Sequence, residues 1–93
     1  MQRDTLDYII RQKKDFIGGT LYDYHKYELV ARHKIIDIKM ERNKDNRIIF
    51  IVCGERSSRS FDIAYFDILD SSSRHYRFKP SMNDVFEIEK RDM

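Results

Sequence analysis

The sequence predicts an α+β domain in which one N-terminal helix packs on an antiparallel meander of about five strands. Three observations lead to this prediction. Apolar residues recur at helical spacing before Gly18–Gly19, apolar and polar residues alternate after it, and short turn sequences separate the alternating segments. A meander of this kind can curl into a small open barrel of the SH3-like type. With 93 residues and no linker or repeat, the chain is expected to form one domain over residues 1–93.

The helix is predicted over about residues 4–17. Asp4 is the expected N-cap, because its carboxylate can accept hydrogen bonds from the free N–H groups of the first turn. Gly18–Gly19 ends the helix, since glycine tolerates the left-handed conformation found there. The apolar face expected to lie on the sheet consists of Leu6, Ile9, Ile10 and Ile17, with Phe16 at its edge.

The strands are predicted within about residues 20–91. The segment YELVARHKIIDIKMER places Ile36, Ile38 and Met40 on one face, and NKDN then forms a hairpin turn. The apolar run RIIFIVC is typical of a central strand. SFDIAYFDIL fits both a helix and a strand, and its aromatic and β-branched residues favour one strand. The last two segments, SSSRHYRFKP and DVFEIEKR, alternate as strands do.

Net charge, hydropathy and cysteine content indicate the class of partner and the cellular compartment to expect. Eighteen basic and sixteen acidic residues leave a net charge of +2, which by itself does not indicate nucleic-acid binding. No apolar run approaches the roughly 20 residues of a membrane-spanning helix, and MQRDTLDYII lacks the pattern of a signal peptide. The single cysteine, Cys53, cannot form an internal disulfide bond. We therefore expect a cytoplasmic protein that does not act on membranes.

The stretch IIFIVCGERSSRS contains the one pattern that suggests a reaction. Cys53 is followed, after five residues, by Arg59 and Ser60, and a strand precedes it. This arrangement resembles the phosphate-binding loop of cysteine-dependent phosphatases, especially the low-molecular-weight class. The resemblance implies a nucleophilic Cys53 thiolate and an Arg59 that binds phosphate oxygens. The residues themselves favour a hairpin turn, because the next segment resembles a strand and Glu55 would repel a phosphate.

Neither a metal nor a cofactor is expected. His25, His33 and His75 do not have the spacing of metal ligands, and a fourth ligand could come only from scattered aspartates. Glu87 and Glu89 lie on the same side of an alternating strand, which is more typical of a solvated face than of an acid–base pair.

Tyrosine and basic residues form the predicted site. In a simple meander, the turns at residues 54–60 and 80–83 and the start of the first strand lie at the same end of the sheet, which brings these side chains together. Tyrosine and arginine are enriched where proteins recognise one another. The predicted partner-binding residues are Tyr22, Tyr24, Lys26, Tyr27, Arg56, Arg59 and Lys79. In the alternative interpretation, the tyrosines only cover the junction between helix and sheet.

Two classes of function remain. The first is a small non-enzymatic protein-binding module, a regulator or inhibitor that docks on a larger protein. Its composition is also typical of accessory proteins of phages or mobile elements. The alternative is a domain that binds RNA or single-stranded DNA, with aromatic rings stacking on bases and arginines contacting phosphates. Self-association through a sheet edge is a further expectation.

Overall fold

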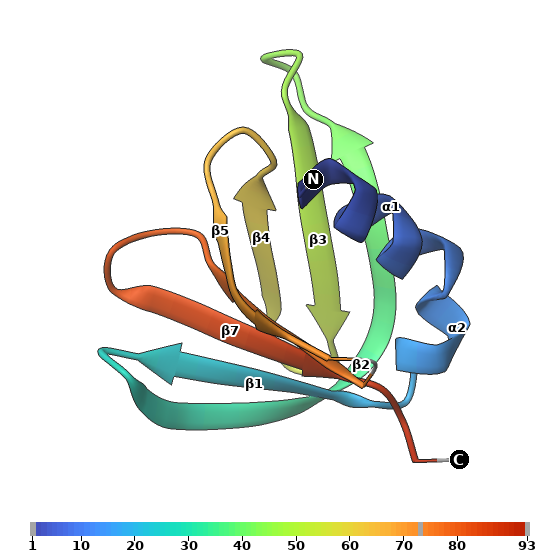
Figure 1. Ribbon diagram of the computed structural model, residues 1–93, viewed down its shortest axis with the longest axis vertical. Coiled ribbons are helices and arrows are strands. Elements are labelled where there is room, and N and C mark those ends of the chain that lie inside the picture. The colour runs from blue at the N-terminus through green and yellow to red at the C-terminus, as the bar shows by residue number, and fades with distance from the viewer. Residues whose placement is uncertain (1, 73, 93) are drawn as a thin grey trace.

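The computed structural model describes residues 2–72 and 74–92 and confirms the α+β class. Helical segments come first and an antiparallel sheet follows (Figure 1). The elements are α1 (Gln2–Arg11), α2 (Lys13–Phe16), β1 (Thr20–His25), β2 (Glu28–Arg42), β3 (Ile48–Gly54), β4 (Ser58–Asp62), β5 (Asp67–Ser71), β6 (His75–Lys79) and β7 (Asp84–Glu89). The sheet thus has seven strands, and the prediction of five was wrong. Neither α1 nor α2 is long and apolar enough to cross a membrane.

The helical region is interrupted, whereas one helix over residues 4–17 was predicted. Gln12 separates α1 from α2 with φ −104° and ψ 19°. Asp4 lies in the first turn of α1 and is not its N-cap. Leu6 and Ile9 are fully buried, as the apolar periodicity predicts. Gly18, with φ +90°, adopts the left-handed conformation expected at the end of the helical region.

The seven strands are arranged in the order β4-β3-β2-β1-β7-β6-β5, and all the strand pairs are antiparallel. β4 and β5 are consecutive in the chain yet form the two opposite ends of this order. Only residues 63–66 connect them, so the sheet must curl until its two ends approach each other. The sheet nevertheless does not close into a barrel.

The curl is concentrated in β2, which belongs to two halves of the sheet. Its first half, to Lys34, pairs with β1, and its second half, from Ile35, pairs with β3. The register shifts between Ile35 and Asp37, so Ile36 is the extra residue of a β-bulge. Such a bulge lets one strand turn the corner between two packed sheets, and β1 and β7 consequently cross β3 and β4 at a steep angle (Figure 1).

Because of the bulge, Ile36 does not share a face with Ile38, and that prediction was wrong. Ile35 and Ile38 are fully buried, whereas Ile36 is 53% exposed. A strict alternation would place Ile36 and Ile38 on the same side, but the extra residue reverses the alternation at this point. The backbone of Ile35 is also tied to the end of the helical region, because its N–H donates to Gly19 O at 2.9 Å.

Aromatic rings from both halves of the sheet meet in the interior. Phe50 and Phe61 come from the β3–β4 side, and Phe78 and Phe86 come from the β6–β7 side. Their ring centroids lie 5.2 to 5.8 Å apart, the separation of favourable aromatic pairs. Phe66, in the link between β4 and β5, stacks on Phe61 at 4.5 Å. This cluster holds the curled sheet together across the gap between its ends.

The ambiguous segment SFDIAYFDIL is two strands and not one. Residues 63–66 form a turn between β4 and β5. The N–H of Ala64 donates to Asp62 Oδ1 at 2.9 Å, and the N–H of Tyr65 donates to Asp62 O at 2.9 Å. These bonds explain the mixed periodicity of the segment, because a tight turn joins two short strands.

Candidate functional site

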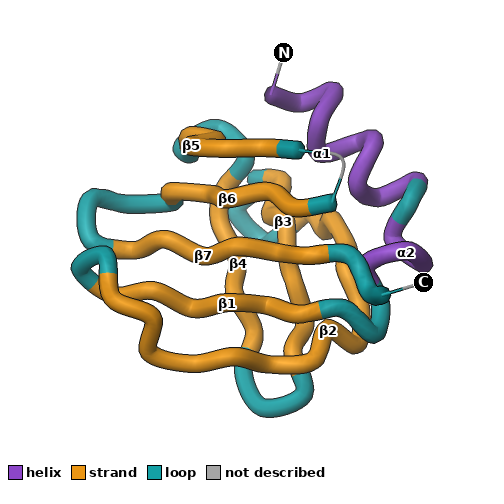
Figure 2. Tube along the Cα trace, turned by 60° about the horizontal axis from the view of Figure 1, so that its bottom comes forward, coloured by secondary structure: helices purple, strands orange, loops and turns teal. Residues whose placement is uncertain are grey.

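One end of the molecule gathers three connections that are far apart in the sequence. The N–H of Lys26, in the turn between β1 and β2, donates to Asn83 O in the turn between β6 and β7 at 3.3 Å. The link between β4 and β5 lies beside the β6–β7 turn, because Tyr65 of the link and Met82 of the turn line the same hollow. Figure 2 shows the β1–β2 and β6–β7 turns side by side at one end of the sheet. We call this region the aromatic end and define it by Tyr24, Lys26, Tyr27, Tyr65, Leu69, Arg77, Lys79, Met82 and Val85.

The β1–β2 turn has a backbone that its residues do not favour. His25 pairs with Glu28, so Lys26 and Tyr27 form a two-residue hairpin loop. Both have positive φ, 49° and 69°, as a type I′ turn requires. Asn-Gly is the usual sequence there, and the left-handed conformation costs roughly 1–2 kcal/mol for each residue with a larger side chain. The strained turn presents Tyr27 to solvent, and its side chain is 75% exposed.

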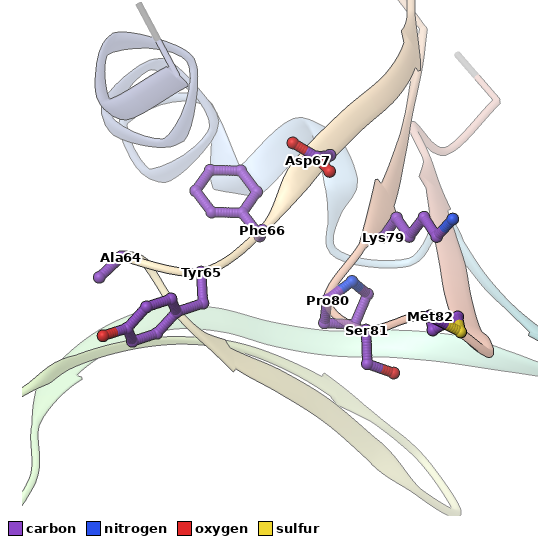
Figure 3. Close-up of a pocket in the computed structure, with 8 residues that line it drawn as sticks. All are labelled: Ala64, Tyr65, Phe66, Asp67, Lys79, Pro80, Ser81 and Met82. Atoms are coloured by element: carbon purple, nitrogen blue, oxygen red, sulfur yellow. The ribbon is translucent and has the colours of Figure 1, made fainter.

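The larger hollow at this end has a volume of about 430 Å³. The link from Ala64 to Asp67 forms one wall, and the segment from Lys79 to Met82 forms the other (Figure 3). Tyr65 and Phe66 point to opposite sides of the link, so Phe66 enters the core while Tyr65 stays 64% exposed. The hollow therefore has an aromatic ring on one side and a proline and a methionine on the other.

Arg47 restrains the exposed Tyr65. Its guanidinium lies 5.6 Å from the centre of the Tyr65 ring, and its Nη1 donates to Asp62 Oδ2 at 2.8 Å. The hydrogen bond from the N–H of Ala64, followed by this one from Arg47, holds the pKa of Asp62 below its usual value. Tyr65 is consequently an oriented surface ring with one face already in contact with a cation.

A second hollow of about 210 Å³ lies on the outer face of the sheet. Tyr24, Tyr27, Leu69, Arg77 and Val85 line it. The Arg77 guanidinium lies 5.3 Å from the centre of the Tyr24 ring and donates to Glu87 Oε1 from Nε at 3.0 Å and from Nη2 at 2.9 Å. The Glu87 side chain is 13% exposed and the Arg77 side chain is 39% exposed, so the carboxylate is the shielded member of the pair. The pair orients the guanidinium against the Tyr24 ring.

The structure separates the seven residues that the sequence placed together. Tyr24, Lys26, Tyr27 and Lys79 lie at the aromatic end. Tyr22 lies nearer the start of β1, away from the β1–β2 turn, and its hydroxyl donates to Glu89 Oε1 at 2.9 Å. Burial, followed by this hydrogen bond and the charge of Glu89, raises the pKa of Tyr22 above its usual value.

The two arginines of the predicted site lie elsewhere. Arg59 is in β4 and forms an ion pair with Asp23, a largely buried carboxylate of β1 that accepts from Arg59 Nε at 2.9 Å. Arg56 is exposed in the β3–β4 turn. That turn adjoins Lys34, because the N–H of Glu55 donates to Lys34 O at 2.9 Å, and Lys34 pairs with the first residue of β1. Arg56 thus lies at the opposite end of the β1–β2 ladder from Tyr27, because β2 turns a corner that a simple meander lacks.

Five residues of the aromatic end were not predicted from the sequence: Tyr65, Leu69, Arg77, Met82 and Val85. Arg77 could have been found, because it alternates with buried Tyr76 and Phe78 and therefore faces outward near the tyrosines. The mixed periodicity around Tyr65 was the other available signal, since it indicates a turn that carries apolar residues.

The segment that resembles a phosphatase loop is a hairpin between β3 and β4. Cys53 pairs with Ser58, and strand β4 follows where the resemblance implies a helix. Gly54 allows the tight turn, since a Cβ there would lie 2.5 Å from Ser57 O. Arg59, the implied phosphate ligand, is bound to Asp23. Within residues 2–72 and 74–92, no three His, Cys, Asp or Glu side chains are placed to hold a metal ion.

The sequence matches no protein-family model, and no curated protein or solved structure matches it significantly.

Proposed function

We propose that this protein is a non-enzymatic protein-binding module that docks its aromatic end on a larger partner, as a regulator or inhibitor does. The observation that carries the proposal is the exposed Tyr27, which lies on a strained turn and lines the second hollow. Strained backbone at a surface position persists where it serves recognition or catalysis, because it destabilises the fold. A Lys-Tyr turn exposes an aromatic ring and a cation at a position where Asn-Gly would be more stable.

The side chains around this turn support a protein partner. Met82 is 81% exposed, and with Tyr65 and Leu69 it leaves a large apolar area open to solvent. Tyrosine, methionine and arginine are the residue types enriched in protein interfaces. The rings of Tyr24 and Tyr65 are held by guanidinium groups, so they lose little conformational entropy when a partner binds.

The alternative, binding to RNA or single-stranded DNA, ranks lower because three arginines are already paired with carboxylates. Arg47, Arg59 and Arg77 each bind a carboxylate: Asp62, Asp23 and Glu87, respectively. Phosphate groups would have to compete with these carboxylates. The origin as an accessory protein of a phage or mobile element stays a hypothesis based on composition.

Capture of partners from a lysate, with and without nuclease treatment, tests the proposal. We expect captured protein that nuclease does not release and that is lost when the bait carries Tyr27→Ala. The matched control bait carries Tyr8→Ala, which removes a partly exposed tyrosine from α1. Release by nuclease would favour the nucleic-acid alternative, and equal capture by both variants would contradict the proposed surface.

A further inference from the structure

Another hollow lies between α1 and the β5–β6 strand pair. It has a volume of about 330 Å³, and its lining residues are Asp4, Thr5, Tyr8, Ser71 and Tyr76. We call it the helix hollow. Ser71 pairs with Tyr76 at one end of the β5–β6 ladder, and Asp67 pairs with Lys79 at the other end. In Figure 2, α1 passes close to one end of β5. The helix hollow is therefore separate from the aromatic end, to which Lys79 belongs.

Tyr76 contributes a nearly buried hydroxyl group to the helix hollow. The residue is only 9% exposed, and its ring centre lies 6.0 Å from that of Phe16 and 6.5 Å from that of Phe78. Among the residues that the structure describes, none forms a hydrogen bond with the Tyr76 hydroxyl. Burial, followed by the charge of Tyr8, raises the pKa of Tyr76 above its usual value, so the hydroxyl end of Tyr76 lies toward α1. A nearly buried hydroxyl usually has a partner, and a ligand in the helix hollow would supply one.

Asp4 contributes a negative charge that the fold does not neutralise. Asp4 and Tyr8 are one helical turn apart in α1, so their side chains lie on the same face of the helix. The neighbouring Arg3 donates instead to Asp7 Oδ1 at 3.3 Å. Within residues 2–72 and 74–92, the Asp4 carboxylate has neither an ion-pair partner nor a hydrogen bond. None of the described lining residues is a lysine or an arginine, so the helix hollow favours a cation over an anion.

The groups that line the helix hollow match an ammonium group. An ammonium group has N–H donors and no acceptor, whereas the Asp4 carboxylate can only accept and the Tyr76 hydroxyl can also accept. The Tyr8 ring is 39% exposed, and the face of a tyrosine ring attracts a cation. The volume lies within the range of small-molecule sites and leaves room for an alkyl chain beside the rings. A neutral alcohol of the same length would lack the attraction to both the carboxylate and the ring.

We propose that the helix hollow binds the primary ammonium group of an alkylamine. Asp4 binds the charge, the Tyr76 hydroxyl accepts a hydrogen bond, and the Tyr8 ring contacts the cation and its alkyl chain. A short amine makes few contacts, so the dissociation constant of the n-butylammonium ion is expected in the range of about 1–10 mM. This inference goes beyond the proposed function and does not depend on it, because the helix hollow is separate from the aromatic end.

A titration with n-butylammonium chloride at neutral pH, up to about 50 mM, tests the site when it is followed by the amide NMR shifts of isotope-labelled protein. We expect saturable shifts at the amides of Thr5, Ser71 and Tyr76. Two control titrations use n-butanol and sodium chloride at the same concentrations, and both should give no saturable shift at these amides. Equal binding of n-butanol, or the absence of saturable shifts with n-butylammonium, would overturn the proposal.

Three variants test the assigned contacts. Asp4→Asn should raise the dissociation constant at least about fivefold, because it removes the charge-assisted hydrogen bond. Tyr76→Phe removes only the hydroxyl and should raise it about threefold, with an unchanged or higher melting temperature. Asp45→Asn is the matched control, because it removes the same charge from an exposed residue of the β2–β3 turn and should bind like the wild type. Equal effects of the two aspartate variants, or a lower melting temperature of Tyr76→Phe, would overturn the proposal.

A second ligand distinguishes the two sources of such a group, a free amine and a lysine side chain. The n-butylammonium ion is the side chain of lysine without its backbone, and the amide of α-N-acetyl-lysine adds the backbone. A dissociation constant at least about threefold lower for the lysine derivative would assign the site to a peptide. Weaker binding of the lysine derivative would assign it to a free amine. Both results support an ammonium site and differ only in the source of the ligand.

Discussion

Aromatic rings occupy two different regions of the protein, one buried and one exposed. Phe50, Phe61, Phe78 and Phe86 are buried against one another where the halves of the sheet meet, whereas Tyr27 and Tyr65 are mostly exposed at the aromatic end. Burying a ring removes apolar area from water and stabilises the fold, but an exposed ring contributes little of this energy. The buried rings, Tyr76 among them, therefore account for the fold. The exposed rings of Tyr27 and Tyr65 need another explanation, and the proposed binding function would provide one.

The two hairpin turns that flank β2 differ in how well their residues suit the conformation of the backbone. In the turn after β2, Asn46 has φ 63°, and the side chain of Asn43 accepts from the N–H groups of Asp45 at 2.9 Å and Arg47 at 3.0 Å. Asparagine tolerates this conformation and supports it with local hydrogen bonds. The turn before β2 places Lys26 and Tyr27 in the same region of backbone conformation, although neither residue favours it. The residues of the β2–β3 turn therefore stabilise its conformation, whereas the β1–β2 turn exposes the Tyr27 ring at a cost in stability.

Phe78→Ala should have the largest effect on stability. Phe78 is fully buried and its ring contacts those of Phe50, Phe61 and Phe86, so truncation should lower the free energy of unfolding by about 3–5 kcal/mol. Urea unfolding followed by circular dichroism measures this change. The control, Tyr65→Ala, should change it by less than about 0.5 kcal/mol. Similar losses in both variants would remove the distinction between the two regions.

Replacing the strained turn should separate stability from binding. Lys26→Asn with Tyr27→Gly provides the residues that a type I′ turn favours and should raise the free energy of unfolding by about 2 kcal/mol. The same change removes the exposed ring and should weaken partner binding. Urea unfolding and a binding titration on the same preparations measure both effects. A variant that is less stable than the parent would contradict the account of the strain.

The opposite change in the other turn should have a smaller effect. Asn46→Lys places an unfavoured residue at φ 63° and removes the hydrogen bond from Arg42 Nη1 to Asn46 Oδ1. We expect the free energy of unfolding to fall by about 1 kcal/mol, with no change in partner affinity. A loss of affinity would mean that the partner also contacts the β2–β3 turn, which adjoins Tyr65 through Arg47.

The smallest effect concerns an ion pair that belongs to neither region. A hydrogen bond from Lys13 Nζ to Asp37 Oδ1, 3.1 Å long, holds the pKa of Asp37 below its usual value, with the N–H of Ile38 contributing. A lowered pKa in the folded state stabilises the protein above the unfolded pKa, and this contribution is lost as the pH falls through the folded pKa. Because both side chains are more than a third exposed, the contribution is below about 0.5 kcal/mol. Asp37→Asn should flatten the fall in stability between about pH 5 and pH 3 by this amount.

The sequence allowed the elements with regular spacing to be predicted. Leu6 and Ile9 recur on one helical face, Phe86 and Ile88 alternate along β7, and all four are buried. The features that depend on irregular backbone were missed. Ile36 is exposed because a bulge reverses the alternation of β2, and β1 was not separated from β2 because Lys26–Tyr27 is not a recognisable turn sequence. Both features are set by the packing of the two sheet halves, which local spacing does not encode.

The site was predictable only in part for the same reason. Tyr24, Lys26 and Tyr27 were identified because the tyrosines cluster in the sequence. Arg56 was placed with them by assuming straight strands, and the corner in β2 moves its turn to the other end of the ladder with β1. Arg59 was assigned to the surface because nothing in the sequence indicates its pairing with Asp23, which is distant in the chain.

The most direct test of the central claim is a titration of the captured partner with wild-type protein, Tyr27→Ala and Tyr8→Ala, together with their melting temperatures. An aromatic anchor at an interface contributes about 2 kcal/mol or more, so Tyr27→Ala should raise the dissociation constant at least about 30-fold with an unchanged melting temperature. Tyr8→Ala should bind like the wild type. Wild-type affinity of the Tyr27→Ala variant would contradict the assignment of the aromatic end as the binding surface.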